Sequence, residues 1–149
     1  LFYSTHDEVE IEMDAHSFSI IEYVRLGFHH AYKYYPLERV SFLFDNKGSY
    51  QIDTAFLFEP PKYEKKLLHH IYNANNALGE KLLKNLSLTK NDKEDVGNLA
   101  PTYMLCYLNG FEEALDKLNE LTAVIKQHSE HAYQGLKDTQ RILRKIKYH

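Results

Sequence analysis

The fold of this chain is decided by residues 108–146, which read LNGFEEALDKLNELTAVIKQHSEHAYQGLKDTQRILRKI. Apolar or small side chains recur there at alternating steps of three and four residues, in an unbroken series that comprises Leu108, Phe111, Leu115, Leu118, Thr122, Ile125, Ser129, Ala132, Leu136, Thr139, Leu143 and Ile146. This spacing places one residue of every half-heptad on a single stripe of a helix. The stripe predicts a helical architecture for this part of the chain, but it indicates no chemical reaction.

A single helix over this stripe would be too long for a compact domain. Over about Thr102–Lys147 it would extend on the order of 70 Å, whereas a domain of this size has a radius of gyration of roughly 15 Å. The stripe is weakest at Thr122, Ser129 and Ala132, whose side chains bury little apolar area. We therefore predict a break at Gln127–Glu130 that produces two antiparallel helices, with one continuous helix as the alternative.

The start of the chain carries the pattern of a strand. Acidic and apolar residues alternate strictly over Glu8–Asp14, and successive side chains of a strand point to opposite faces. We expect Val9, Ile11 and Met13 to face a core while the acids face solvent. The acids are interpreted first as protection of a soluble edge strand against aggregation. Because like charges on one strand face repel each other, the alternative is a patch that binds a basic partner.

The next segments predict a helix followed by a hairpin. Ser17–Tyr35 begins with capping-box spacing and ends before Pro36, which predicts a helix. Ser41–Phe44 and Tyr50–Phe58 are rich in aromatic and β-branched residues, which predicts two strands. Asp45–Gly48 supplies residues that tolerate a tight turn between those strands.

Apolar spacing then predicts a helix over about Lys62–Leu86, and the polar segment Leu88–Gly97 predicts an exposed loop. The expected fold is α+β: a small antiparallel three-stranded sheet in β-α-β-β order, packed against helices, with a long C-terminal helix or helical pair. We expect a single domain over residues 1–149, with the sheet and first helix in 1–61 and the helical part in 62–149.

Composition narrows the function classes. The net charge of −3 argues against direct nucleic-acid binding, which needs a basic surface. No apolar run approaches the roughly 20 residues that cross a bilayer, so we expect a cytoplasmic protein without membrane insertion. The single cysteine, Cys106, lies in an apolar segment and is interpreted as a buried structural thiol.

Nine histidines raise the alternative of a metal site. His128 and His131, at positions i and i+3, could bind one metal ion together with His70 or His30 from another helix and a carboxylate such as Glu112. The His-Glu-x-x-His and Glu-x-x-His motifs are both absent from the sequence. The main prediction is therefore that the chain holds no metal and no other cofactor.

Acidic residues form two sets that predict a partner-binding surface. The first, on the predicted strand, is Glu8, Glu10, Glu12 and Asp14; the second, early in the last segment, is Glu112, Glu113, Asp116 and Glu120. The end of that segment is basic, so its two halves can also attract each other if it folds back. The functional hypothesis is that both sets form one negative surface that covers a basic site on another protein.

No catalytic motif accompanies these acids: Gly-x-Ser-x-Gly, a Walker motif and a dinucleotide fingerprint are all absent. Small, slightly acidic α+β domains of this kind resemble the immunity proteins of bacterial toxin systems. That resemblance implies a non-catalytic inhibitor whose partner is a basic nuclease toxin. The alternatives are a histidine-carboxylate metal enzyme or sensor, and a scaffold that pairs as a coiled-coil homodimer rather than remaining a monomer.

Overall fold

The computed structural model describes residues 9–28 and 33–149. The chain divides into two compact units. The sheet unit contains Leu1–Arg25, Lys33–Glu59 and His149, and the helical unit contains Leu26–Tyr32 and Pro60–Tyr148. The architecture is α+β, as predicted, and each unit is described by itself below.

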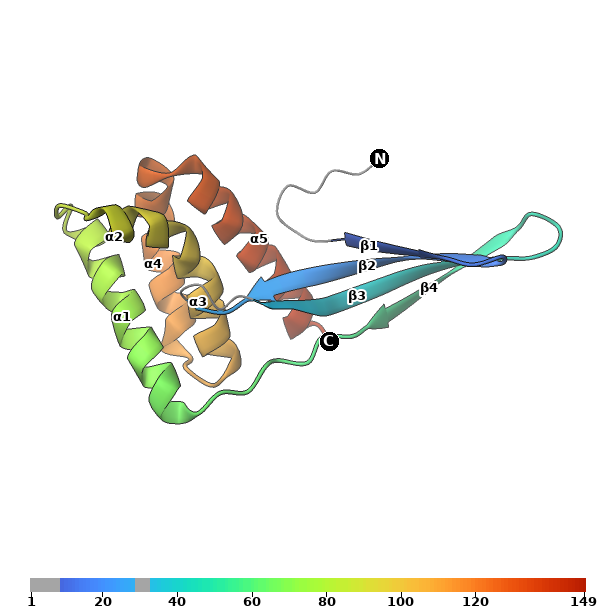
Figure 1. The fold of residues 1–149 in the computed structure, drawn as a ribbon, viewed down its shortest axis with the longest axis horizontal. Coiled ribbons are helices and arrows are strands. Elements are labelled where there is room, and N and C mark those ends of the chain that lie inside the picture. Colours follow the sequence, from blue (N-terminus) through green and yellow to red (C-terminus); the bar gives the residue numbers. More distant parts are fainter. Residues whose placement is uncertain (1–8, 29–32) are drawn as a thin grey trace. The chain divides into compact units, whose positions relative to one another are not determined.

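The sheet has four strands, not three (Figure 1). They are β1 (Val9–Met13), β2 (Ser17–Leu26), β3 (Lys33–Phe44) and β4 (Tyr50–Phe56). The strands lie in the order β1-β2-β3-β4 and form an antiparallel meander. The fold prediction was therefore wrong in its strand number and in its β-α-β-β order.

The error lies in Ser17–Tyr35, which was predicted to be a helix. Its first ten residues form β2, and Lys33 already belongs to β3; residues 29–32 lie outside the described part of the chain. Ile20, Ile21 and Val24 are β-branched and favour a strand that pairs on both sides. Tertiary pairing with β1 and β3 outweighs the local capping-box signal.

The predicted hairpin is confirmed. β3 and β4 pair antiparallel from Glu38↔Phe56 to Phe44↔Tyr50, and β3 extends further toward the N-terminus than expected. In the turn, the Asp45 carboxylate accepts hydrogen bonds from the amides of Lys47 (2.8 Å) and Ser49 (2.9 Å). Gly48 adopts φ +80°, a left-handed conformation that glycine takes without steric cost.

The helical unit begins with the predicted helix, α1 (Lys65–Leu83). The segment predicted to be a loop is instead α2 (Lys90–Asp95) followed by the 3-10 turn η1 (Val96–Asn98). A capping box starts α2: the Thr89 hydroxyl accepts from the Asp92 amide (3.1 Å), while the Asp92 carboxylate accepts from the Thr89 amide (2.9 Å). The loop prediction was wrong because it used polarity and missed this reciprocal cap.

The last third of the chain forms α3 (Leu99–Leu108), α4 (Glu113–His128) and α5 (Glu130–Lys147), and α5 runs back along α4 (Figure 1). The predicted break is confirmed at Ser129, whose backbone is extended and whose hydroxyl accepts from the Ala132 amide (3.2 Å). An unpredicted break separates α3 from α4, where Gly110 adopts φ +95°. The continuous-helix alternative is wrong.

The core of the helical unit is formed by the apolar stripe and the residues it packs against. Leu118, Ile125 and Leu136 are each at most 1% exposed. Tyr103 donates a hydrogen bond from its hydroxyl to Asn76 Oδ1 (2.7 Å), which satisfies the polar end of an otherwise buried ring. Among the described residues, no helix has both the length and the apolar character required to span a membrane.

Candidate functional site

The sheet carries one face of apolar side chains, here called the apolar face. Strand register assigns its members: Ile11 is opposite Ile20, Met13 opposite Phe18, and Phe42 opposite Ile52. The Phe18 and Phe42 rings stack with centroids 4.5 Å apart, which joins the two halves of the face across β2 and β3. The described members of the face in the sheet unit are Val9, Ile11, Met13, Phe18, Ile20, Val24, Val40, Phe42, Phe44, Tyr50, Ile52 and Phe56, of which Val24 is buried.

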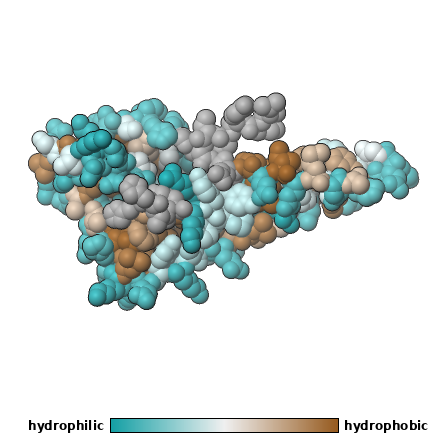
Figure 2. Space-filling model, viewed as in Figure 1, coloured by the Kyte–Doolittle hydropathy of each residue, from teal (hydrophilic) through white to brown (hydrophobic). Residues whose placement is uncertain are grey.

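Much of this face is exposed. Val9, Ile11 and Met13 were predicted to face a core, but they are 43%, 61% and 80% exposed, and that prediction was wrong. Tyr50 (59%) and Ile52 (58%) are similarly exposed on β4. Hydrophobic residues, in brown, accordingly appear at the surface of the strands (Figure 2). Alternation along a strand sets which side chains share a face, but it does not supply a layer to cover them.

The exposed area is large for a domain of this size. If each large apolar side chain offers roughly 150–200 Å², the exposed fractions of Val9, Ile11, Met13, Phe44, Tyr50 and Ile52 amount to on the order of 600 Å². The largest apolar patch on a typical monomer is roughly 300–600 Å², and such patches commonly mark interaction sites.

The sheet unit is also acidic. Its described residues include eight acidic and four basic side chains, a formal charge of −4, whereas those of the helical unit include eleven acidic and fourteen basic ones, a charge of +3. Strand register places Glu22 and Glu38 in the same face as Val9 and Phe56. Asp14 and Asp45 lie in the turns at the other end of the strands. Carboxylates therefore lie at both ends of the apolar face.

The predicted acids of β1 have internal roles. The Tyr23 hydroxyl donates to Glu10 (2.6 Å), which raises the pKa of Tyr23, and Glu12 forms an ion pair with Arg39 (3.3 Å). In the register of β1 and β2, Glu10 pairs with Ile21 and Glu12 with Ser19, whereas the apolar face contains Ile11 and its partner Ile20. Both acids therefore lie on the other face of the sheet. The predicted site residue Glu8 lies outside the described residues.

Asp14 stabilises the turn between β1 and β2. Its carboxylate accepts from the amides of His16 (2.7 Å) and Ser17 (2.8 Å) and from the Ser17 hydroxyl (2.7 Å). These hydrogen bonds, that of the Ser17 side chain first, lower the pKa of Asp14. Asp14 is thus a structural turn residue as well as part of the acidic border.

The second predicted set lies in the other unit, at the start of α4. Glu112 is the N-cap residue, and Glu113 and Asp116 lie in the first turn, where the helix dipole favours negative charge. Glu120 pairs with Lys117 (3.1 Å), within its own helix. Glu112, Glu113 and Asp116 make no ion pair with any residue that the structure describes. The two predicted sets thus belong to different units.

The histidines do not form the predicted ligand geometry. Ser129 separates His128, the last residue of α4, from His131 in α5, so the expected spacing on one helix is lost. His70 lies on α1. Among the described residues, no three His, Cys, Asp or Glu side chains are grouped so that they could hold a metal ion. His29 and His30 lie outside the described residues.

Cys106 is fully buried in α3, as interpreted from the sequence. Burial raises the pKa of its thiol to about 12, so almost no thiolate exists at neutral pH. Burial and the raised pKa both favour a structural role for this cysteine over a nucleophilic one.

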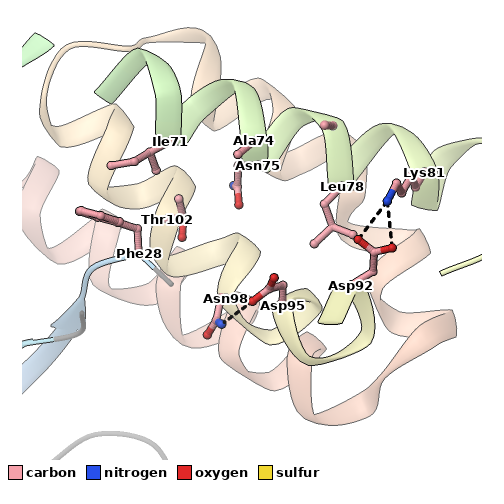
Figure 3. A pocket seen from close by; sticks show the side chains of 11 residues that line it. Phe28, Ile71, Ala74, Asn75, Leu78, Lys81, Asp92, Asp95, Asn98 and Thr102 are labelled. Atoms are coloured by element: carbon pink, nitrogen blue, oxygen red, sulfur yellow. Dashed lines mark hydrogen bonds and ion pairs between the residues drawn. The ribbon is translucent and has the colours of Figure 1, made fainter. Parts of the chain in front are cut away.

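The helical unit contains a cavity of about 160 Å³ that the sequence patterns did not indicate. α1 forms one wall, and α2, η1 and α3 form the other, with Phe28 at one end (Figure 3). Lys81 and Asp92 form an ion pair at the other end (2.9 Å), which lowers the pKa of Asp92. The polar residues of the cavity come from four separate segments, so no spacing in the sequence could indicate that they lie together.

The fold thus defines an α+β protein with a meander sheet and a helical unit. Over residues 1–149 the chain matches the family model described as Domain of unknown function (DUF5929), and it belongs to that family. No curated protein and no solved structure matches the chain.

Proposed function

We propose that this domain is non-catalytic and binds another protein through the apolar face of its sheet. The observation that carries the proposal is the exposure of Ile11, Met13, Tyr50 and Ile52 on a single face of paired strands. Leaving such a surface in water costs free energy, and cover by a partner recovers it. The area is near the roughly 800 Å² that each partner contributes to a standard protein interface.

The charge of the sheet unit favours a particular partner. A second copy would bring the same formal charge of −4 against the same face, and like charges at a shared interface oppose association. A protein with an apolar centre and a basic border fits better, because its border would meet the carboxylates at both ends of the face. The helical stripe is less suited to pairing, since Leu118, Ile125 and Leu136 are already buried in their own chain.

A basic, apolar-centred surface is also the chemistry of many nucleic-acid-binding sites on proteins. Our finer proposal is therefore an inhibitor that acts in the cytoplasm on a basic nuclease toxin, as an immunity protein does. Three exposed acids support this version, because they remain available to basic groups of a partner. They are Glu112, the N-cap residue of α4, and Glu113 and Asp116 in its first turn. The sheet face, and not β1 alone, supplies the main contact.

The test is a selection with a matched pair of variants. A display library of protein fragments from the source genome is selected on the wild-type protein, and enriched fragments are measured against Ile11→Thr/Ile52→Thr and against Gln51→Thr. Gln51 lies beside Ile52 on β4 but on the opposite face, so it controls for damage to the strand. Threonine keeps the β-branched side chain that strands favour.

We expect enriched fragments to be rich in apolar and basic residues. They should bind the double variant at least about tenfold more weakly, since two buried contacts are lost, and bind Gln51→Thr as they bind the wild type. Association should slow as salt rises. Fragments that bind the double variant normally, or an outcome with no enrichment over an unrelated protein, would contradict the proposal. An acidic fragment would contradict the choice of partner.

A further inference from the structure

The cavity of the helical unit presents hydrogen-bond acceptors in excess of donors. Asn75 from α1, Asp95 from α2 and Thr102 from α3 point into the same space (Figure 3). Each comes from a different helix, and all three side chains are at most partly exposed. The cavity lies wholly within one unit, so its geometry does not depend on the sheet.

Each of these donor groups already makes one hydrogen bond inside the protein. Asn75 Nδ2 donates to the Leu99 carbonyl (3.2 Å), and Thr102 Oγ1 donates to the Gly27 carbonyl (3.4 Å). Asn98 Nδ2 donates to one oxygen of Asp95 (3.4 Å), which orients the carboxylate and leaves its other oxygen to accept. Asn75 and Asn98 each keep one N–H, but the free lone pairs of the Asn75, Asp95 and Thr102 oxygens outnumber these donors, which suits a ligand that brings donors.

The charge of the lining residues also favours a ligand with hydrogen-bond donors, and specifically a cation. Lys81 is the only cation that lines the cavity among the described residues, and its ammonium donates to both oxygens of Asp92 (3.0 and 2.9 Å). Asp95 makes no ion pair with any residue in the described part of the chain. The lining thus has one uncompensated negative charge.

The remainder of the cavity is apolar. Ile71 and Leu78 of α1 are buried in its wall, Ala74 lies between them, and the Phe28 ring closes one end. At about 160 Å³, the cavity is comparable with the roughly 150 Å³ that accommodates a benzene molecule. A ligand of this size with a short alkyl stem and a planar cationic head would fill it.

We propose that this cavity binds an alkylguanidinium group, with the guanidinium on Asp95, Asn75 and Thr102 and the alkyl stem against Ile71 and Leu78. A guanidinium has five donors, is weakly hydrated and packs on aromatic rings, so it suits these acceptors together with Phe28. An arginine side chain of a protein and a free guanidine compound share this chemistry. The inference is independent of the function proposed for the sheet.

The test uses n-butylguanidinium and its neutral isostere n-butylurea, titrated into ¹⁵N-labelled protein at low salt. We expect saturable shifts at amides near Asn75, Asp95 and Thr102, with a dissociation constant on the order of 1–10 mM for so small a ligand. Asp95→Asn should weaken binding about tenfold. Glu94→Gln, an exposed acid one residue away on α2, serves as the control and should change nothing.

The source of the ligand is distinguished by two further titrations. A blocked tripeptide with a central arginine that binds at least as tightly as n-butylguanidinium would assign the site to a protein side chain. Binding of n-butylguanidinium but not of the tripeptide would assign it to a small molecule. The proposal is overturned if n-butylurea binds equally well, or if Asp95→Asn behaves like Glu94→Gln while its thermal unfolding is unchanged.

Discussion

The two units of this protein use apolar periodicity in opposite ways. In the helical unit, a three-four stripe becomes a core in which Leu118 and Leu136 are at most 1% exposed. In the sheet unit, strict alternation on β1 yields a face in which Ile11 and Met13 are more than half exposed. A hydrophobic period therefore predicts which residues lie together, but a second layer decides whether they are buried. The exposure of this face is the observation on which the proposed contact with another protein rests.

The largest expected effect is the difference in unfolding free energy between substitutions of buried and of exposed apolar residues. Leu118→Ala or Leu136→Ala should lower the free energy of unfolding by about 2–5 kcal/mol, because each leaves a cavity in a packed core. Ile52→Thr should change it by less than about 0.5 kcal/mol, as an exposed position does. Urea unfolding curves measure both values. A loss of several kcal/mol for Ile52→Thr would show that the face is part of a core.

The packing of the helical unit can be examined with two glycines. A Cβ on Gly79 would lie 3.0 Å from Leu121 Cδ1, whereas one on Gly135 would meet no atom within 4 Å. Gly135→Ala should therefore stabilise the protein by about 1 kcal/mol through helix propensity. Gly79→Ala should gain less or lose stability, because Leu121 must move. Equal stabilisation by both variants would contradict the close packing of α1 on α4.

The capping box predicts a smaller and more local effect. Thr89→Ala should lower the free energy of unfolding by about 1 kcal/mol, while Thr89→Ser should retain most of the cap. The measurement is again urea unfolding, now with amide exchange of α2. If the α2 amides of Thr89→Ala exchange as slowly as those of the wild type, the capping box is not the reason that this polar segment forms a helix instead of a loop.

The same cap predicts a pH dependence. The hydrogen bond from Lys81, first, and then that from the Thr89 amide lower the pKa of Asp92 in the folded protein. The carboxylate therefore stabilises the fold above its unfolded-state pKa, and this contribution is lost as pH falls through the lowered folded-state pKa. Asp92→Asn should destabilise the protein at pH 7 and have little effect at the acid end. If the wild type and Asp92→Asn differ in unfolding free energy as much at low pH as at pH 7, the proposed dependence of stability on the ionised Asp92 carboxylate is contradicted.

The smallest expected effect is the reaction of Cys106 with a thiol reagent in the folded protein. With a pKa of about 12 and full burial, the thiol should not react with a thiol reagent at pH 8 until the helical unit unfolds. The rate of labelling should follow the urea transition of the core. Rapid labelling of the native protein would mean that the core around α3 opens far more readily than its packing indicates.

Sequence reasoning recovered the elements whose signals are local. The Asp45–Gly48 turn, helix α1 and the break at Ser129 each depend on residues close in the chain. The helix predicted over Ser17–Tyr35 failed because pairing with β1 and β3 decides the conformation of β2, and those partners are remote in sequence.

The candidate sites were harder to predict for the same reason. Counting charges identified Glu10 and Glu12 but could not show that Tyr23 and Arg39 already contact them. The cavity combines residues from Phe28 to Thr102, which only the folded chain brings together. The strand pattern of β1 did contain the apolar face, but the sequence offers no measure of its exposure.

The most direct test of the account is a paired measurement on Ile11→Thr/Ile52→Thr. Its affinity for a fragment selected on the wild-type protein and its free energy of unfolding are determined under the same conditions. We expect the double variant to bind at least about tenfold more weakly than the wild type and to have a free energy of unfolding within about 0.5 kcal/mol of the wild-type value. Unchanged affinity, or a fold that loses several kcal/mol while binding is preserved, would contradict the assignment of the apolar face to a partner.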